Sequence, residues 1–201
     1  MYEERVESAR LSLVDIKSWI ISTLDTCGGK PRIRNTRLRV RDIIEMVKNG
    51  EEDKIYQDYK YVTKSAVDAC LIYNDRNEKC VEYFREINET LAAFLTTALE
   101  LPQDKLEIKY NIDEEQELTY DILDECIDFL MRCEQRRPGI CKDMSITLVD
   151  GIITLGYYKL QTYINIYRDE DGTLGTEIFQ YRGKEFKVGK LITFDEFMNI
   201  H

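Results

Sequence analysis

Six cationic side chains lie within twelve residues near the N-terminus: Lys30, Arg32, Arg34, Arg37, Arg39 and Arg41. Side chains at every second position project from the same face of an extended strand. Guanidinium groups bind phosphate oxygens, and they also form paired hydrogen bonds with O6 and N7 of guanine. The spacing therefore predicts an arginine-bearing β-hairpin that contacts nucleic acid. Six phosphate contacts correspond to a log–log salt slope of about −5.

A second group of polar residues follows at the expected start of a helix. Two short helices are predicted at residues 51–59 and 63–74, and a short turn joins them, as in a helix-turn-helix. Thr63, Lys64 and Ser65 would stand at the N-terminus of the second helix, the end that usually contacts base edges. We therefore add these three residues to the predicted interface. Two other interpretations of the arginines remain open: they bind a protein partner, or they form a solvated strand edge.

The order of motifs in this region resembles that of the domain-of-unknown-function 433 family, often labelled VapB-like antitoxin. Gly28-Gly29-Lys30-Pro31, Ile33 and Thr36-Arg37 carry the resemblance, which covers about residues 19–75. Asn35 stands where the family usually has glycine, and Arg39 stands where it usually has proline. The resemblance implies a strand–turn–strand segment followed by three helices, and a DNA-binding, antitoxin-like regulator.

The scarcity of histidine excludes several kinds of catalytic site. The single histidine is His201, so Ser-His-Asp or Cys-His catalysis and histidine-based metal sites would need a side chain from the chain terminus. The six cysteines form no CxxC pair, and we expect Cys70, Cys80, Cys126 and Cys133 to be buried on apolar helix faces. We expect no cofactor.

Acidic residues on one predicted helix provide an alternative with different chemistry. Asp121, Asp124, Glu125 and Asp128 share one side of a helix at 119–136. Converging carboxylates of this kind hold the metal ions of nucleases, whereas a row of acids opposite an apolar stripe is the usual solvated helix face. No complete catalytic set is present among the residue types, so we do not expect an enzyme, and a metal-dependent nuclease remains the alternative.

Charge divides the chain into two unlike parts. The 201 residues carry a net charge of −10, yet residues 1–75 hold 13 Lys/Arg and 13 Asp/Glu, whereas residues 76–201 hold 15 and 25. Such an asymmetry favours one module that meets a polyanion and another that meets a different partner. The chain shows no signal peptide and no membrane-spanning run of apolar residues, so a cytoplasmic location is expected.

The elements that must position these residues follow from periodicity and turn signals. Strands are expected at 19–23, 32–34, 37–41 and 106–112, helices at 3–15, 41–48, 51–59, 63–74, 77–99 and 119–136, and an antiparallel meander from residue 145 onward. The fold class is thus α+β. We predict a helix-turn-helix domain with an arginine-rich β-hairpin at 1–75, a connecting and dimerisation helix at 76–101, and an acidic α+β module at 102–201.

These expectations combine into one hypothesis about function. The chain is predicted to be a homodimeric, DNA-binding, antitoxin-like transcriptional regulator that binds double-stranded operator DNA. Its acidic module is predicted to bind a partner protein, such as a cognate toxin with a cationic surface. The alternatives are a metal-dependent nuclease that uses Asp121 and Asp124, and a protein-interaction adaptor that binds no DNA.

Overall fold

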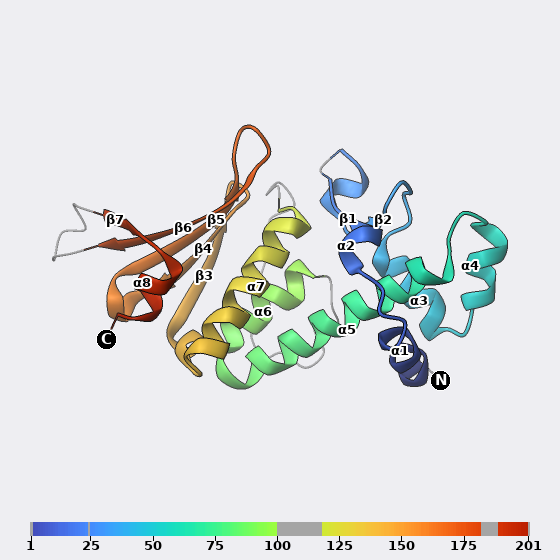
Figure 1. Cartoon of the computed structure of the whole chain (residues 1–201), viewed down its shortest axis with the longest axis horizontal. Coiled ribbons are helices and arrows are strands. Elements are labelled where there is room, and N and C mark those ends of the chain that lie inside the picture. Colours follow the sequence, from blue (N-terminus) through green and yellow to red (C-terminus); the bar gives the residue numbers. More distant parts are fainter. Residues whose placement is uncertain (1, 24, 100–117, 182–188, 201) are drawn as a thin grey trace. The chain divides into compact units, whose positions relative to one another are not determined.

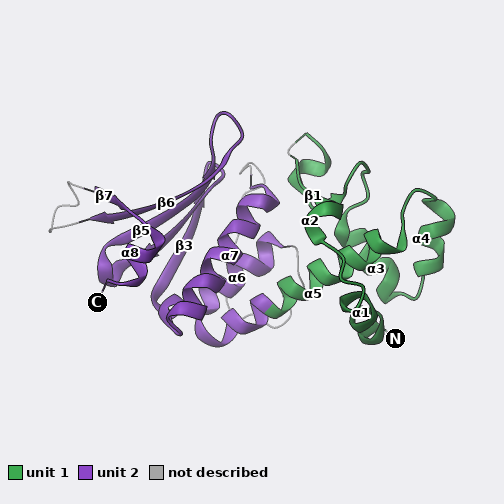
Figure 2. Ribbon diagram, in the orientation of Figure 1, with its two compact units in different colours: residues 1–79 green, residues 80–201 purple. Residues whose placement is uncertain are grey.

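The chain folds into two compact units, Met1–Lys79 and Cys80–His201 (Figure 1, Figure 2). The computed structural model describes residues 2–23, 25–99, 118–181 and 189–200. Helices and a small antiparallel sheet make up the first unit, and helices and a five-stranded antiparallel sheet make up the second. The predicted α+β fold is therefore confirmed. The division between the units falls inside helix α5, Lys64–Ile87.

The core of the first unit is formed by helices that precede and follow a two-stranded sheet in the sequence. Strand β1 pairs with β2 in antiparallel fashion, and Ile20 lies opposite Ile33. Buried side chains from four helices, including Val6, Ile43, Ile55 and Val67, pack into one apolar cluster. The elements are α1 (Tyr2–Arg10), α2 (Ile16–Trp19), β1 (Ile20–Ile21), η1 (Cys27–Gly29), β2 (Arg32–Ile33), α3 (Val40–Lys48), α4 (Glu52–Asp58) and the first part of α5.

The predicted strand at 37–41 is reduced to a single antiparallel bridge between Arg39 and Arg32. Strand β2 covers only Arg32–Ile33, and Asn35 then adopts a left-handed conformation with φ of 62°, at which the chain turns back. The Ile33 amide donates to the Leu38 carbonyl, and the Val40 amide donates to the Pro31 carbonyl, both at 2.9 Å. The Thr36 hydroxyl donates to the Ile33 carbonyl and accepts from the Leu38 amide, which stabilises this turn. Helix α3 begins soon afterwards, so the five arginines do not share the face of one hairpin.

The predicted helix break near Asn74-Asp75 is wrong. Helix α5 runs through both residues, because their side chains bond to α1 instead of to the backbone of their own helix. Asn74 Nδ2 donates to the Tyr2 hydroxyl at 3.4 Å, and Asp75 pairs with Arg10 at 2.6 Å. The helix ends at Ile87 instead, and the next residue is Asn88. The Asn88 Oδ1 accepts a hydrogen bond from the Leu91 amide and caps the next helix, α6 (Glu89–Ala98).

The second unit contains the predicted antiparallel meander. Its strands follow the order β3-β4-β5-β6-β7, and each is antiparallel to its neighbour. Helices α6 and α7 cover one face of the sheet (Figure 1). The elements after α6 are α7 (Tyr120–Arg136), η2 (Ile140–Asp143), β3 (Met144–Val149), β4 (Ile152–Tyr157), η3 (Tyr158–Leu160), β5 (Thr162–Arg168), β6 (Leu174–Tyr181), β7 (Gly189–Ile192) and α8 (Phe194–Met198).

Several other expectations can be compared with the structure. Cys70, Cys80, Cys126 and Cys133 are buried, as predicted, and burial raises the pKa of the Cys133 thiol to about 12. The strand expected at 106–112 lies outside the described residues. Helix α8 was not predicted. Within the described ranges, no helix has both the length and the apolar content that a membrane crossing requires.

Candidate nucleic-acid interface

The structure leaves most of the nine predicted interface residues accessible to solvent. Arg34, Arg37, Arg41, Thr63 and Lys64 are exposed, and Lys30, Arg39 and Ser65 are half-buried. Arg32 differs from the rest, since only 8% of it is exposed. The predicted set is therefore mainly a surface set, but its members have different local roles.

Arg32 and Arg34 are both tied to the backbone of the first unit. The Arg32 guanidinium donates to the Thr23 hydroxyl at 2.8 Å and to the Thr36 carbonyl at 3.3 Å. Arg34 donates to the carbonyls of Lys17 and Ser18 at 2.8 and 3.0 Å. These carbonyls belong to α2, whose last turn leaves acceptors without partners in the helix. The two arginines thus hold the segment after β2 against its neighbours.

Arg39 and Arg41 pair with carboxylates on their own helix, α3. Arg39 contacts Asp42 at 2.8 Å, and Arg41 contacts Glu45 at 2.9 Å. All four side chains are more than a third exposed. Exposed ion pairs of this kind contribute only about 0–1 kcal/mol, so they cost little to exchange for a contact with phosphate.

Arg37 lies in a shallow pocket that sequence reasoning did not predict. Its lining comes from three segments of the first unit: Thr26, Arg32, Asn35, Thr36, Arg37 and Tyr61. Tyr61 belongs to the turn between α4 and α5, so the pocket joins the arginine segment to the start of α5. We call it the Arg37–Tyr61 pocket. In the sequence, an aromatic residue within a polar turn, Tyr61, is the signal that could have indicated this pocket. Its side chain is exposed in the structure.

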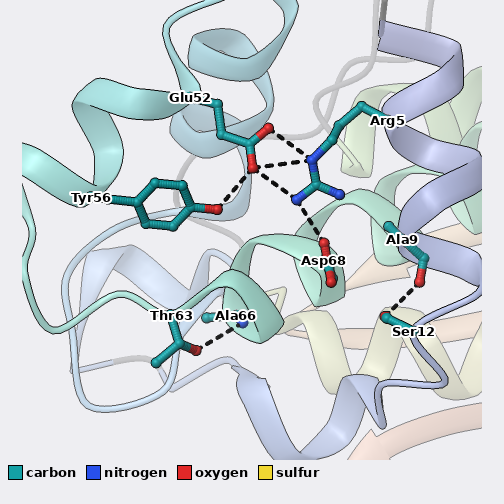
Figure 3. A network of polar contacts seen from close by, with 8 residues as sticks. All are labelled: Arg5, Ala9, Ser12, Glu52, Tyr56, Thr63, Ala66 and Asp68. Atoms are coloured by element: carbon teal, nitrogen blue, oxygen red, sulfur yellow. Dashed lines mark hydrogen bonds and ion pairs between the residues drawn. The ribbon is translucent and has the colours of Figure 1, made fainter.

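Helices α4 and α5 follow the predicted order of two helices and a short turn, but α5 continues to Ile87, beyond the predicted end at residue 74. Residues 59–63 join them, and the buried side chains of Ile55 and Val62 anchor the two sides of the turn. The Thr63 hydroxyl accepts from the Ala66 amide at 3.2 Å and caps α5 (Figure 3). Lys64 therefore stands exposed in the first turn of α5, as the sequence predicts for this part of the interface.

A polar network positions α4 against α1 and α5 (Figure 3). Arg5 binds both oxygens of Glu52 and also contacts Asp68 at 2.7 Å, while the Tyr56 hydroxyl donates to Glu52 at 2.8 Å. Burial opposes ionisation of Glu52, but the hydrogen bonds from Arg5 and Tyr56 and the charge of Arg5 outweigh it and lower the pKa of this carboxyl. Sequence reasoning missed Arg5, because its partners are distant in the chain.

Two of the four acidic residues predicted on one side of α7 pair with cations. Asp121 pairs with Arg168, and Glu125 pairs with Arg132 at 3.1 Å and accepts a hydrogen bond from Thr176. Across the described parts of the chain, no three Cys, His, Asp or Glu side chains are grouped so that they could hold a metal ion. The nuclease alternative stays a prediction from the sequence.

Comparison with known proteins identifies part of the first unit. Residues 20–74 match the family model described as Protein of unknown function (DUF433). This match confirms the resemblance that the sequence motifs indicated. No curated protein and no solved structure matches the chain.

Proposed function

We propose that the first unit binds double-stranded DNA, and that the protein is a cytoplasmic, antitoxin-like transcriptional regulator. One observation carries this proposal. Arg37 and Tyr61 line the same pocket, and the exposed N-terminal end of α5 begins three residues after Tyr61. Cations and a helix N-terminus therefore belong to one local surface, which is the arrangement by which helix-turn-helix proteins bind a duplex.

The residues of this surface would make two kinds of contact with DNA, to base edges and to phosphates. The start of α5, with Thr63, Lys64 and Ser65, would approach the base edges in the major groove. Lys30, Arg37, Arg39 and Arg41 would contact phosphates, and the last two would exchange their exposed carboxylate partners for phosphate oxygens. Arg32 and Arg34 would support the surface from within, through their bonds to the backbone.

The proposal also assigns a role to the second unit and to a second copy of the chain. A homodimer would place two helix-turn-helix units on a palindromic operator. The C-terminal part carries the excess acid, with 15 Lys/Arg and 25 Asp/Glu in residues 76–201. It would bind a protein with a cationic surface, such as a cognate toxin.

A fluorescence titration of labelled duplex at several salt concentrations tests the DNA-binding proposal. The duplex is the protein's own upstream DNA. The test variant combines Arg37→Ala, Arg41→Ala and Lys64→Ala, and it leaves Arg32 and Arg34 in place because they bond to the backbone. The control variant changes three other exposed cations, Lys79, Lys159 and Lys190, to Ala.

We expect the wild type and the control to show a log–log salt slope of about −3.5, which corresponds to the four phosphate contacts of Lys30, Arg37, Arg39 and Arg41. The test variant should bind at least tenfold more weakly, with a slope shallower by about 2, because it removes two of the four phosphate contacts. Absence of duplex binding by folded protein at low salt contradicts the proposal. Equal weakening in the two triple variants also contradicts it, because general charge would then account for the binding.

A further inference from the structure

The Arg37–Tyr61 pocket has the size and the chemistry of a small-molecule site. Its volume is about 640 Å³, within the range of roughly 300–1,000 Å³ that ligand pockets occupy. Two guanidinium groups, one amide side chain, two hydroxyls and one phenol ring line it. All of these groups belong to the first unit. They lie in β2, in the segments before and after it, and in the turn before α5.

One end of the pocket is suited to an anion. Arg32 is only 8% exposed, it makes two hydrogen bonds with its five N–H donors, and its Nε is buried without a hydrogen-bond partner. Within the described residues, neither Arg32 nor Arg37 has a carboxylate oxygen within ion-pair distance. A buried cation without such a partner favours a bound anion, and phosphate offers guanidinium groups the best-matched acceptors.

One exposed carboxylate, Asp25, lies near this end of the pocket. The pKa of Asp25 is lowered, chiefly by the hydrogen bond from the Thr23 hydroxyl, with a contribution from the charge of Arg32. Thr26, which lines the pocket, donates a hydrogen bond to the same carboxylate at 3.4 Å. Asp25 is exposed, so its charge is screened by solvent more strongly than the buried guanidinium.

The other end is suited to a planar ring. Tyr61 is 63% exposed, and its contact with the neighbouring ring of Tyr59 is edge-on, with centroids 6.2 Å apart. Exposed tyrosines in polar surroundings stack against nucleobases. Asn35 is exposed in the same pocket, and an asparagine amide can pair with the donor and acceptor edge of adenine.

We propose that this pocket binds a nucleoside monophosphate unit, with the phosphate at Arg32 and Arg37 and the base against Tyr61. The proposal goes beyond duplex binding and does not require it. The same chemistry has two sources, a free mononucleotide or a single nucleotide of a nucleic-acid strand. The experiment separates them.

The test is isothermal titration calorimetry of the full chain with AMP, with inorganic phosphate and with adenosine. AMP should bind at least tenfold more tightly than inorganic phosphate or adenosine, since only AMP uses both ends of the pocket. Arg37→Ala should weaken AMP binding at least tenfold, and Tyr61→Ala should weaken it at least fivefold. Tyr61→Phe keeps the ring and should stay within about twofold of the wild type. Arg136→Ala removes an exposed arginine of the second unit and should leave AMP binding unchanged.

The outcomes separate the two sources and the two proposals. A titration with a short single-stranded oligoadenylate separates the two sources: tighter binding than that of AMP assigns the pocket to a nucleotide of a strand, and weaker binding than that of AMP assigns it to a free nucleotide. The proposal is overturned if AMP does not bind, if inorganic phosphate binds as tightly as AMP, or if the Arg37→Ala and Tyr61→Ala variants bind AMP like the wild type. A failure of duplex binding alone leaves these results unaffected.

Discussion

Glu134 is a carboxylate in an unfavourable place, because it stands near the C-terminus of α7, where the helix dipole repels negative charge. It is only 4% exposed, and it accepts hydrogen bonds from the Gly139 and Cys141 amides at 2.7 Å and from the Tyr83 hydroxyl at 2.9 Å. Burial raises its pKa, but these donors outweigh burial and the pKa is lowered overall. The ionised side chain therefore holds the segment after α7 in place.

The substitution Glu134→Gln should lower the free energy of unfolding by about 2 kcal/mol at pH 7, since hydrogen bonds to a charged group are lost. The folded pKa lies below the unfolded value of about 4.5, so the stabilisation is present above that value and disappears as the pH falls through the folded pKa. Urea unfolding followed by far-ultraviolet circular dichroism should show the stabilities of the two proteins converging as the pH falls below 4.5. Glu86→Gln, at an exposed position of α5, is the control. A difference that stays constant with pH contradicts this assignment.

At the same scale, residue type predicted which side chains are accessible to solvent better than it predicted their local contacts. The alternation of cationic and apolar residues predicted that Arg32 lies on the same exposed face as the other arginines. In the structure Arg32 is buried, and its guanidinium donates hydrogen bonds to Thr23 and Thr36. The pocket that includes Tyr61 was not predictable, because it depends on how the turn before α5 packs near the segment after β2. Contacts between residues that are distant in the sequence determine both the burial of Arg32 and the lining of this pocket.

At the scale of the elements, local signals predicted the sheet of the second unit well. The turn at Asp150-Gly151 has positive φ at both residues, as a tight hairpin requires, and the strands on both sides alternate apolar and polar positions. Helix α8 could have been predicted, since Thr193 and Glu196 form a capping box. Helix breaks were harder to predict, because Asn74 and Asn88 look alike until their partners are known.

This contrast leads to a prediction about the two asparagines. Asn88 caps α6, and its Nδ2 donates to the Cys141 and Met144 carbonyls at 2.7 Å. Asn88→Ala should therefore lower the free energy of unfolding by about 2–3 kcal/mol. Asn74→Ala, in the middle of α5, should change it by about 0.5 kcal/mol or less, because alanine favours a helix. Urea midpoints from circular dichroism measure both. Equal losses would show that Asn88 has no special role at the break.

At the scale of the whole molecule, each unit has its own apolar core. One cluster includes Val6, Ile43 and Leu71, and the other includes Phe94 and Leu155. Helix α5 contributes side chains to both clusters. The sequence predicted a separate connecting helix at 76–101, whereas the compact units divide between Lys79 and Cys80. The role of this region in dimerisation stays a prediction.

The first core depends on α1 through Arg5, and this can be measured. Arg5→Met would leave Glu52 and Asp68 without their cation in a mostly buried site, so we expect unit 1 to lose about 2–4 kcal/mol of stability. Trp19 is the only tryptophan and lies in this unit, so its fluorescence during urea unfolding reports the loss. Arg41→Met breaks an exposed pair and should cost about 0.5 kcal/mol or less. A similar small loss for Arg5→Met would show that the ion pairs of Arg5 do not stabilise unit 1.

The packing of α1 has a consequence for how such a module is inherited. The segment shared with other proteins spans residues 20–74, yet Arg5, Val6 and Ala9 of α1 belong to the same folded body. The segment that the family model matches is therefore shorter than the unit that folds in this chain. A gene fusion that transplanted only residues 20–74 would carry Glu52 and Asp68 without a counter-ion, and the recipient protein would have to supply a substitute for α1.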